Sequence, residues 1–542
     1  MALLVDVGCT GYINPPSAQR PGAATAGTGP GNGQASNTPV AIQYATVRLT
    51  NVQYLNTVHD LLPGVTFADP ALPNENVTDN FNNAASGQTP TSELVEDYQN
   101  AAEAIAAAVG GSFTALLSCQ PTSVADEDTC ATGFIKDFGK RAYRRPLTDD
   151  ESTRFFNFYK SERATDNFQT AITSVIQVFL QSPATIYRLE AGSGSGSGGL
   201  IPLTSYEVAS RLSYLLTNSM PDATLFQAAD QGQLLDPAQI AVQARRLLKD
   251  PRARVAVASF NYQWLQFSRM DATTKDAKSF PTFTASIAQA LHDSTVRYVD
   301  HAFWDLNSLP ALLTDTHAYV NDALAPFYGV AAPGSSDMQL VSVDSSRRAG
   351  ILTQPGLLAG LAGPVDDSPV KRGVLVLDSL LCATPPPPPP GVNTNPPPFD
   401  PSVPTTTRER FVTQHAVGGC AACHTPIDAI GFTFENYDAV GAWRTQENGL
   451  PVDATSELNG TDIDGPLNGA VMLAGKLAQS KQVAQCVSYH WLRYSLGLDL
   501  SQINTAAAHD VADTFWSASG SFQDLLVAIA QSEYFRSVKV SN

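Results

Sequence analysis

Three places in the chain carry the same signature of a helix start, and this signature constrains the fold most. A Thr is followed three residues later by Gln or Glu, so that each side chain can satisfy a free backbone N–H group at the beginning of a helix. A Leu precedes each Thr, as in a hydrophobic staple. The three capping boxes are Thr50–Gln53, Thr148–Glu151 and Thr204–Glu207.

The apolar residues that follow these signatures have the periodicity of amphipathic helices. Clear apolar faces run over Val208–Leu216 and Ala241–Leu248, and Phe168–Leu189 reads as one long amphipathic helix. The alternation that is typical of β-strands is scarce. We therefore predict a mainly α fold of several packed helical bundles, with long irregular connections around residues 310–410.

The charge balance excludes some classes of function. The chain has 542 residues, with 33 Lys and Arg against 51 Asp and Glu, so its formal net charge is −18. Binding to nucleic acid needs a basic face that neutralises phosphates, and none is visible. No run reaches the roughly 20 consecutive apolar residues of a transmembrane helix. An integral helical membrane protein is therefore not expected.

The segment Cys420-Ala421-Ala422-Cys423-His424 matches the C-x-x-C-H pattern of covalent c-type haem attachment. The two thiols add to the two vinyl groups of the haem, and the adjacent His becomes the proximal iron ligand. A zinc site would need another pair of ligands at short spacing, which does not follow. A redox C-x-x-C pair would not need the His. We predict a C-terminal cytochrome c-like haem module with one covalent haem.

The other five cysteines fit an oxidising compartment, where haem c is attached and disulfides persist. Cys119 and Cys130 lie in a polar segment and are expected to form a local disulfide. Cys382 and Cys486 either form a second, long-range disulfide or remain buried thiols. The Gly-Cys pair that ends at Cys9 resembles a bacterial lipid-attachment site, although no basic n-region precedes it. A disordered N-terminus is the alternative.

Three segments of biased composition divide the chain. Gly11–Val40 lacks the apolar residues needed to fold and reads as a tether. Gly192–Gly199 is a flexible Gly/Ser linker. Pro385–Pro390 is a run of prolines that favours extended polyproline II. Shortly before the proline run, the adjacent acids Asp366 and Asp367 indicate a solvated turn.

Five groups of motifs follow one another in an order that resembles a known family. They are Arg48–Leu62, Phe138–Thr148, Leu203–Asp222, Ser368–Gly373 together with Cys420–Trp443, and Val483–Gly497 together with Phe522–Phe535. The sequence is similar here to planctomycete- and myxobacterial-type cytochrome c-like proteins, in which domains of uncharacterised function (DUF1587, DUF1595, DUF1592, DUF1588 and DUF1585) stand in that order. The resemblance covers residues of about 45 to 540 and implies an exported haem protein without a settled reaction.

The resemblance implies a division of the chain into modules. After an N-terminal tether, these are a DUF1587-like helical module, a DUF1595-like helical module, a DUF1592-like helical module, a DUF1588-like haem c module with the polyproline linker, and a DUF1585-like helical module. Their expected ranges are 1–44, 45–130, 131–191, 200–340, 341–455 and 456–542. One departure is visible: relatives often carry a His and a basic residue before Ser-Pro-Val, where this chain has Gly363–Asp367.

The second axial position of the iron has several candidates. Met472 follows His424 by 48 residues, a separation comparable with that in small cytochromes c, and would raise the reduction potential. His490 would lower it. His415, another residue, or no protein ligand at all are the remaining alternatives. Arg444 and Arg410 are candidates for pairing with the haem propionates, because the Arg fork matches a carboxylate.

Two classes of function follow from these residues. The first is an exported mono-haem c-type cytochrome-like protein that acts in electron transfer or as a multidomain, peroxidase-like oxidoreductase, with an unknown redox partner or substrate. The second is a surface scaffold lipoprotein that binds polysaccharide or protein, in which the haem is structural or sensory. The aromatic run Phe155–Tyr159 would suit sugar binding, although helical spacing favours the core. Both place the chain in the periplasm or at the cell surface, with membrane attachment only through a lipid at Cys9.

Overall fold

The structure is a computed structural model that describes residues 46–193, 200–387, 397, 403–415, 420–498 and 505–539. The chain divides into two units, Met1–Thr38 and Pro39–Asn542, and every described residue belongs to the second. The predicted tether with Cys9, most of the Gly/Ser linker and the end of the proline run lie outside the described residues.

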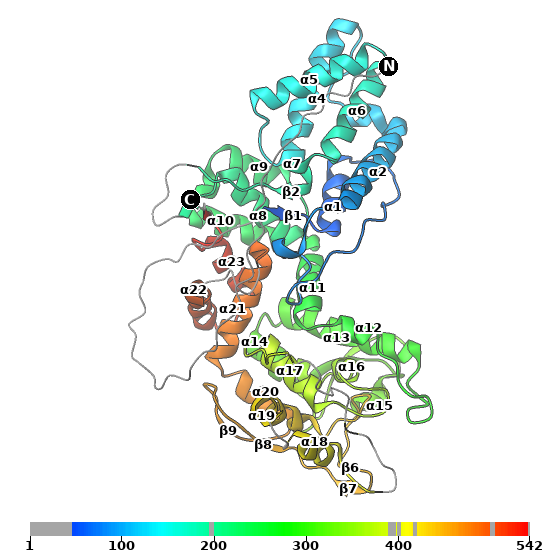
Figure 1. The fold of residues 1–542 in the computed structure, drawn as a ribbon, viewed down its shortest axis with the longest axis vertical. Coiled ribbons are helices and arrows are strands. Elements are labelled where there is room, and N and C mark those ends of the chain that lie inside the picture. Colours follow the sequence, from blue (N-terminus) through cyan, green and yellow to red (C-terminus); the bar gives the residue numbers. More distant parts are fainter. Residues whose placement is uncertain are drawn as a thin grey trace. The chain divides into compact units, whose positions relative to one another are not determined.

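The first part of the described chain is a helical bundle closed by a two-stranded sheet (Figure 1). Its elements are β1 (Val47–Arg48), α1 (Asn51–Leu61), η1 (Ala85–Gly87), α2 (Ser92–Ala108), η2 (Val109–Ser112), α3 (Phe113–Leu116), α4 (Val124–Tyr143), α5 (Asp149–Arg163), α6 (Phe168–Leu180), α7 (Pro183–Ile186) and β2 (Tyr187–Arg188). β1 pairs with β2 in antiparallel register, Val47 opposite Arg188. One apolar cluster fills this bundle.

The predicted helix over 168–189 is wrong in its second half. α6 ends at Leu180, and a new short helix, α7, begins at Pro183. Proline has no backbone N–H and restricts the residue before it to extended backbone, so Ser182 leaves the helix although the apolar pattern continues. In the same bundle Phe155 and Tyr159 are buried. Phe156 and Phe158 pack against the core, so the aromatic run forms no exposed sugar platform.

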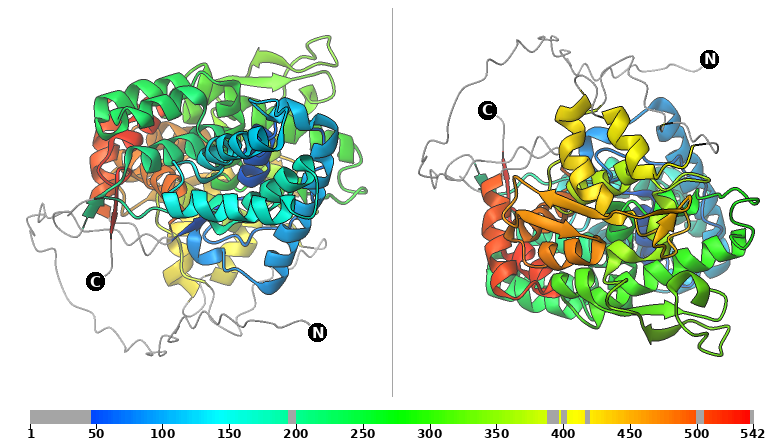
Figure 2. Two further views of the ribbon diagram at one scale, coloured as in Figure 1. Left: turned by 90° about the horizontal axis from the view of Figure 1, so that it is seen from above. Right: turned by 90° about the horizontal axis from the view of Figure 1, so that it is seen from below.

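Most of the remaining elements share a second apolar core that contains residues from 203 to 538 and also Phe81. Buried residues within 318–328 pack with Leu291 and Val440 in a smaller third cluster. Both clusters belong to the second part of the described chain. Its helices up to the proline run are α8 (Ser205–Thr217), α9 (Ala223–Asp230), η3 (Gln233–Leu235), α10 (Pro237–Leu247), α11 (Pro251–Trp264), α12 (Ser268–Asp271), α13 (Ala285–Trp304), α14 (Leu309–Thr314), α15 (Ala325–Tyr328), η4 (Ile351–Thr353), α16 (Pro355–Gly360) and α17 (Pro369–Ser379). After that run come α18 (Thr407–His415), α19 (Cys420–Gly431), η5 (Phe432–Phe434), α20 (Ala470–Leu477), α21 (Lys481–Leu496), α22 (Thr505–Ser517) and α23 (Phe522–Gln531). Figure 2 gives two more views of their packing. The three later predicted modules therefore contribute to one continuous core.

The described strands outside the first bundle also form two-stranded antiparallel pairs. They are β3 (Leu200–Pro202) with β10 (Ser537–Lys539), β4 (His317–Val320) with β5 (Gln339–Ser342), β6 (Gln446–Glu447) with β7 (Leu450–Pro451), and β8 (Thr455–Leu458) with β9 (Gly465–Asn468). The β3–β10 pair joins the end of the described chain to the start of α8. The stretch 310–387, predicted to be largely irregular, instead contains the β4–β5 hairpin and short helices.

The local predictions of helix starts are confirmed. Each of the three Thr side chains accepts the backbone N–H of the residue three positions later, and the Gln or Glu side chain at that position returns to the backbone N–H of the Thr. The mainly α fold is confirmed as well. Within the described residues, no helix combines the length and the apolar character needed to cross a membrane.

Candidate functional site

The C-x-x-C-H segment forms the beginning of α19, so positions 420 and 423 fall within its first turn and position 424 begins the second. Cys423 is half-buried, and its thiol is free. The predicted pairs Cys119–Cys130 and Cys382–Cys486 are both disulfides in the structure, with Cα atoms 5.8 and 5.4 Å apart. The side chain of Cys420 lies outside the described residues. The oxidised pairs therefore leave Cys423 available for other chemistry.

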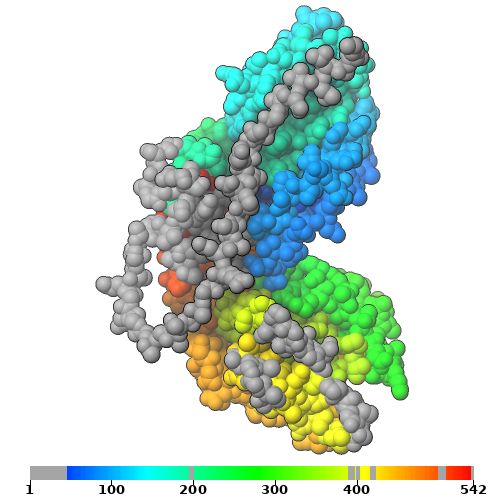
Figure 3. All heavy atoms as spheres, viewed as in Figure 1, coloured from blue at the N-terminus to red at the C-terminus, as the bar shows by residue number. Residues whose placement is uncertain are grey.

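α19 is held by close backbone contact with α17. A Cβ atom at Gly373 of α17 would collide with the carbonyl oxygen of Ile427, and one at Gly431 of α19 would collide with the carbonyl oxygen of Pro369. Glycine at both positions lets the two helices approach backbone to backbone. α19 also packs against β8. In the space-filling view of Figure 3, the region of α18 and α19, drawn in yellow, lies at the surface of the molecule.

Three polar side chains gather beside the motif. The rings of His415, the last residue of α18, and His424 stack with their centroids 3.6 Å apart. The Nδ1 atom of His415 lies 2.7 Å from Oδ2 of Asp428, within hydrogen-bond distance. Nδ1 of His424 lies 4.0 Å from the other oxygen, Oδ1, of the same carboxylate. The helical spacing of four residues puts His424 and Asp428 on one face of α19.

This arrangement leaves two buried polar atoms facing one another without a hydrogen bond: Nδ1 of His424 and Oδ1 of Asp428. Burial, reinforced by the nearby His415, lowers the pKa of His424, while Asp428 opposes the shift. A neutral imidazole is the form that binds a metal ion. The ligand atoms of His415, His424 and Asp428 all lie within 4.8 Å of one another. The free thiol of Cys423, the neutral imidazole and its unpaired Nδ1 therefore fit a covalently attached haem.

A network of buried charges lies behind α19. Asp367, predicted to be in a solvated turn, has a fully buried side chain, which lies 3.4 Å from Arg372 and 3.1 Å from Arg444. The prediction is wrong because these two guanidinium groups compensate the carboxylate inside the protein. Arg372 also donates to the carbonyl oxygens of Tyr437 and Asp438, both at 2.8 Å.

Both arginines that were candidates for the propionates are engaged by carboxylates of this chain. Arg444 lies 3.2 Å from Glu447 in addition to Asp367. Arg410 lies 3.2 Å from Asp366. A propionate at either position would have to join or replace these partners, so both assignments stay predictions. Next to Arg444, burial and then Asp367 raise the pKa of Glu435 well above its ordinary value.

The candidates for the second axial position lie in different environments. Met472 stands on α20 with 43% of its surface exposed. His490 is buried in α21, where its Nε2 atom lies 3.2 Å from the carbonyl oxygen of Asp378 and 3.6 Å from Sγ of Cys382. Its pKa is lowered to about 4 by burial and by Arg493. His415 is the candidate that the structure brings beside His424.

Sequence reasoning missed two parts of the site. Asp428 carries a signal that was available, because it follows His424 by one helical turn. Glu447 carries none: it reaches back 40 residues, where its carboxylate accepts the backbone N–H of Thr407 at 2.8 Å and the hydroxyl at 2.7 Å. This contact holds the start of α18 and with it the helix that ends at His415.

Comparison with family models identifies the class of protein. Five models match in the predicted order, each described as a protein of unknown function: DUF1587 over residues 48–110, DUF1595 over 130–190, DUF1592 over 203–330, DUF1588 over 348–447 and DUF1585 over 464–535. The DUF1588 model, which includes the C-x-x-C-H segment, bears the cytochrome-type name PSCyt3. The chain belongs to the planctomycete-type multidomain cytochrome c-like family. No curated protein and no solved structure matches it.

Proposed function

We propose that this chain is an exported mono-haem c-type cytochrome that acts in electron transfer or as a multidomain oxidoreductase. The haem is joined to Cys420 and Cys423, and His424 is the proximal iron ligand. The observation that carries the proposal is the start of α19, where the free thiol of Cys423 precedes a half-buried His424. The cytochrome-type name of the matching domain supports it.

The residues around α19 have distinct roles in this proposal. Bound haem supplies one-electron exchange between two oxidation states of its iron. Cys420 and Cys423 fix the macrocycle to the first turn of α19. Asp428 orients the imidazoles, because it holds His415 through Oδ2 and offers Oδ1 to His424. Carboxylates in such outer positions fix the tautomer of a ligating His and raise its basicity.

His415 ranks first among the candidates for the second iron ligand because the structure places it beside His424; since its ring is stacked on that of His424, it would have to leave this stack to bind iron from the opposite side. Asp428 binds its Nδ1 atom at 2.7 Å, which leaves Nε2 as the atom that can meet a metal. Nε2 of His490, by contrast, lies against the carbonyl oxygen of Asp378, to which it can donate its proton. Met472 is exposed to solvent over 43% of its surface. If His415 binds iron, the closed coordination favours electron transfer; an open position favours oxidoreductase chemistry.

Export to the cell envelope is part of the proposal. Two disulfides support an oxidising compartment, because cytosolic thiols are kept reduced. A lipid at Cys9 would attach the protein to a membrane. Spheroplast fractionation of the source cells tests the location, and labelling with a fatty-acid analogue tests Cys9, with Cys9→Ser as the control. Recovery in the cytosol would contradict export and would also weaken the haem assignment, because haem c is attached outside the cytoplasm.

The test of the haem assignment is expression with the c-type maturation machinery, followed by denaturing electrophoresis with haem staining and a pyridine haemochrome spectrum. We expect one covalent haem per chain in the wild type and none in Cys420→Ala/Cys423→Ala. The matched control is Cys119→Ala/Cys130→Ala, which also removes two cysteines and should keep the haem. A wild type without covalent haem, despite maturation, overturns the proposal.

The spectrum of the loaded protein distinguishes the two kinds of activity. A low-spin spectrum that becomes high-spin in His415→Ala, and not in Met472→Ala or His490→Gln, assigns the second axial ligand and supports electron transfer. A high-spin wild type that binds cyanide supports an oxidoreductase. Loss of the low-spin spectrum only in Met472→Ala would contradict the ranking of His415.

A further inference from the structure

A cavity of about 500 Å³ lies at α21, away from the C-x-x-C-H segment. Its described lining residues come from three of the matched domains: Asp79 and Asn80 from the first, Asp378 and Cys382 from the fourth, and His490 and Arg493 from the fifth. No residue of α18 or α19 is among them. The volume suits a small molecule, since ligand sites commonly measure about 300–1,000 Å³.

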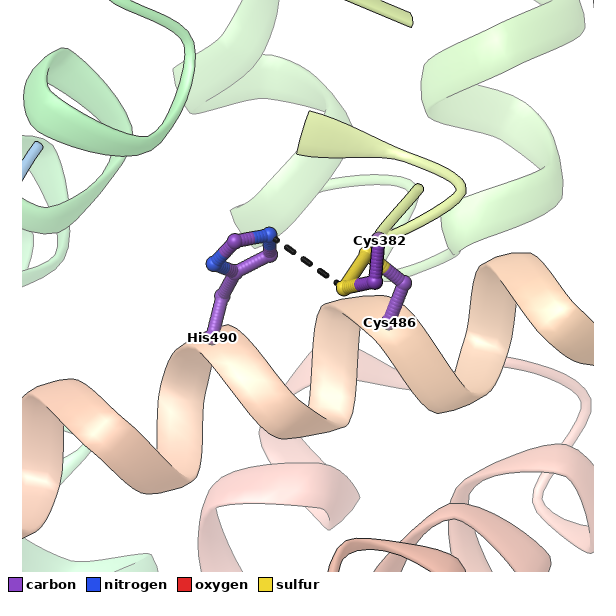
Figure 4. Close-up of side chains that lie close together, drawn as sticks. All are labelled: Cys382, Cys486 and His490. Carbon is purple, nitrogen blue, oxygen red and sulfur yellow. Dashed lines mark hydrogen bonds between the residues drawn. A yellow bond between two sulfur atoms is a disulfide. The ribbon is translucent and has the colours of Figure 1, made fainter. Parts of the chain in front are cut away.

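The disulfide Cys382–Cys486 forms part of the cavity wall. Its two cysteines differ in access, because Cys382 is exposed whereas Cys486 is buried. Figure 4 shows His490 one helical turn beyond Cys486 on α21, with its Nε2 atom 3.6 Å from Sγ of Cys382. An incoming group would therefore meet Cys382 first, next to an imidazole.

The surroundings can accommodate the reduced pair as well as the disulfide. Sγ of Cys486 lies 3.8 Å from the carbonyl oxygen of Asp378 and 3.7 Å from that of Ser379, so a thiol there has acceptors for its proton. Nε2 of His490 lies 3.2 Å from the same carbonyl of Asp378 and therefore carries the proton in that contact. This N–H can also stabilise a thiolate at Cys382, because a nearby donor favours the charged form.

The backbone of the cavity wall is unusual. Cys382 has φ 49°, and the adjacent residues Asp79 and Asn80 have φ 48° and 73°, although none of the three is glycine. Thr78 and Phe81 pair across the turn that Asp79 and Asn80 form, and both residues of this turn line the cavity. Residues held in the left-handed region cost free energy and gather at functional sites.

We propose that Cys382–Cys486 is a thiol–disulfide exchange site for small zwitterionic thiols, such as cysteine-containing peptides. Charges of both signs line the cavity: Asp79 and Arg493, which pair with each other at 3.4 Å, and Asp378. This inference goes beyond the haem assignment and does not depend on it. The disulfide and His490 belong to described residues distant in sequence from the C-x-x-C-H segment.

The exchange proceeds in two balanced steps. The thiolate of a first thiol attacks Sγ of Cys382, the bond to Cys486 breaks, and Cys486 leaves as a thiolate that takes up the proton released by the incoming thiol. A second thiol attacks the sulfur of the first in the mixed disulfide, and Cys382 leaves next to the N–H of His490 and is protonated. Two thiols thereby become one disulfide, and the protein pair is reduced. Added small-molecule disulfide reverses both steps.

The test equilibrates the full chain in mixtures of reduced and oxidised glutathione, alkylates free thiols and quantifies each cysteine peptide by mass spectrometry. Cys119–Cys130 is the internal control, because it is a disulfide of the same chain that is remote from the cavity. The glutathione ratio is the squared concentration of the reduced form divided by the concentration of the oxidised form. We expect half of Cys382–Cys486 to be reduced at a ratio at least tenfold lower than Cys119–Cys130 requires. This corresponds to a reduction potential at least about 30 mV higher, since the couple transfers two electrons. If both disulfides are half-reduced at the same glutathione ratio, Cys382–Cys486 is a structural disulfide and the proposal is overturned.

A matched pair of single variants tests the order of attack. In Cys486→Ser the exposed Cys382 should form a glutathione adduct about tenfold faster than the buried Cys486 does in Cys382→Ser, since access limits exchange. Equal rates, or an adduct only at Cys486, contradict the assigned roles. If either variant fails to fold, as near-ultraviolet circular dichroism would reveal, the wild-type equilibrium still decides the proposal. His490→Phe should make Cys382–Cys486 harder to reduce and leave Cys119–Cys130 unchanged.

Discussion

His415 and His424 stack ring against ring at 3.6 Å, and both face the carboxylate of Asp428. One oxygen of Asp428 holds His415, while the other is buried without a partner beside Nδ1 of His424. A single carboxylate thus influences both imidazoles. Its charge favours a proton on Nδ1 of each ring, which leaves both Nε2 atoms as the ones that can bind a metal.

Asp428→Asn is the first prediction. The amide keeps the shape of the carboxylate and removes its charge, so an iron bound by His424 loses electron density and the reduction potential of the loaded protein should rise. We expect a shift of about 60 mV, which is tenfold in a one-electron equilibrium. Spectroelectrochemical titration measures it. Glu457→Gln, at an exposed position of β8, removes a charge that solvent screens and should leave the potential nearly unchanged. Equal shifts in the two variants would show that Asp428 does not tune the iron through His424.

Gly373→Ala is the second prediction. The new Cβ would collide with the backbone of Ile427, so α17 and α19 must separate. We expect a loss of about 1–3 kcal/mol in the free energy of unfolding, typical of overpacking, and less covalent haem per chain. Urea denaturation and haem staining measure the two effects.

Gly475→Ala is the matched control for this change. Gly475 lies inside α20, and a Cβ there meets nothing within 4 Å. Alanine is the better helix former, so this variant should gain roughly 0.5–1 kcal/mol. If Gly373→Ala and Gly475→Ala change stability and haem content to the same extent, Gly373 is not needed for the close contact between α17 and α19.

Features that depend on a few neighbouring residues could be predicted from the sequence. The capping box at Thr148 needs only Glu151, and the structure has the expected pair of hydrogen bonds. The C-x-x-C-H segment is similarly local, and the structure places it at a helix start. The disulfide Cys382–Cys486 is not local, since its cysteines lie 104 residues apart. It is one of two alternatives that the sequence leaves open for these residues, and the expected oxidising compartment favours the pairing.

Other features that depend on distant segments could not be predicted from the sequence. The hydrogen-bond contact of His415 with Asp428 forms only because α18 and α19 pack against each other. The burial of Asp367 requires Arg372 and Arg444, which lies 77 residues away. Adjacent acids are usually solvated, and only a three-dimensional neighbourhood of guanidinium groups reverses that preference.

Arg372→Ala is the third prediction. It removes one of the two cations that compensate Asp367 in the buried network, and it leaves the carbonyl oxygen of Tyr437 without a donor. Breaking one partner of a buried ion pair costs about 3–5 kcal/mol, because the other charge stays buried. Guanidinium denaturation should report a loss of this size.

A surface pair and a double variant control this result. Arg245→Ala removes a comparable ion pair with Asp524, whose side chains are 58% and 37% exposed, and should cost less than about 1 kcal/mol. Asp367→Asn/Arg372→Ala removes both charges and should be more stable than Arg372→Ala alone. A double variant that is no more stable would mean that the incompletely compensated charge of Asp367 is not the source of the loss.

His490 gives the fourth prediction, a pH dependence of stability. Burial and Arg493 lower its pKa from 6.5 to about 4 in the folded protein. Between these two values the unfolded chain binds a proton that the folded chain does not, so the free energy of unfolding decreases as the pH falls through this window, by up to about 3 kcal/mol. Above pH 6.5 the contribution is constant. His490→Gln cannot bind this proton, so its melting temperature should decline less than that of the wild type from pH 6.5 to 4. The same decline in both proteins would show that His490 does not carry the effect.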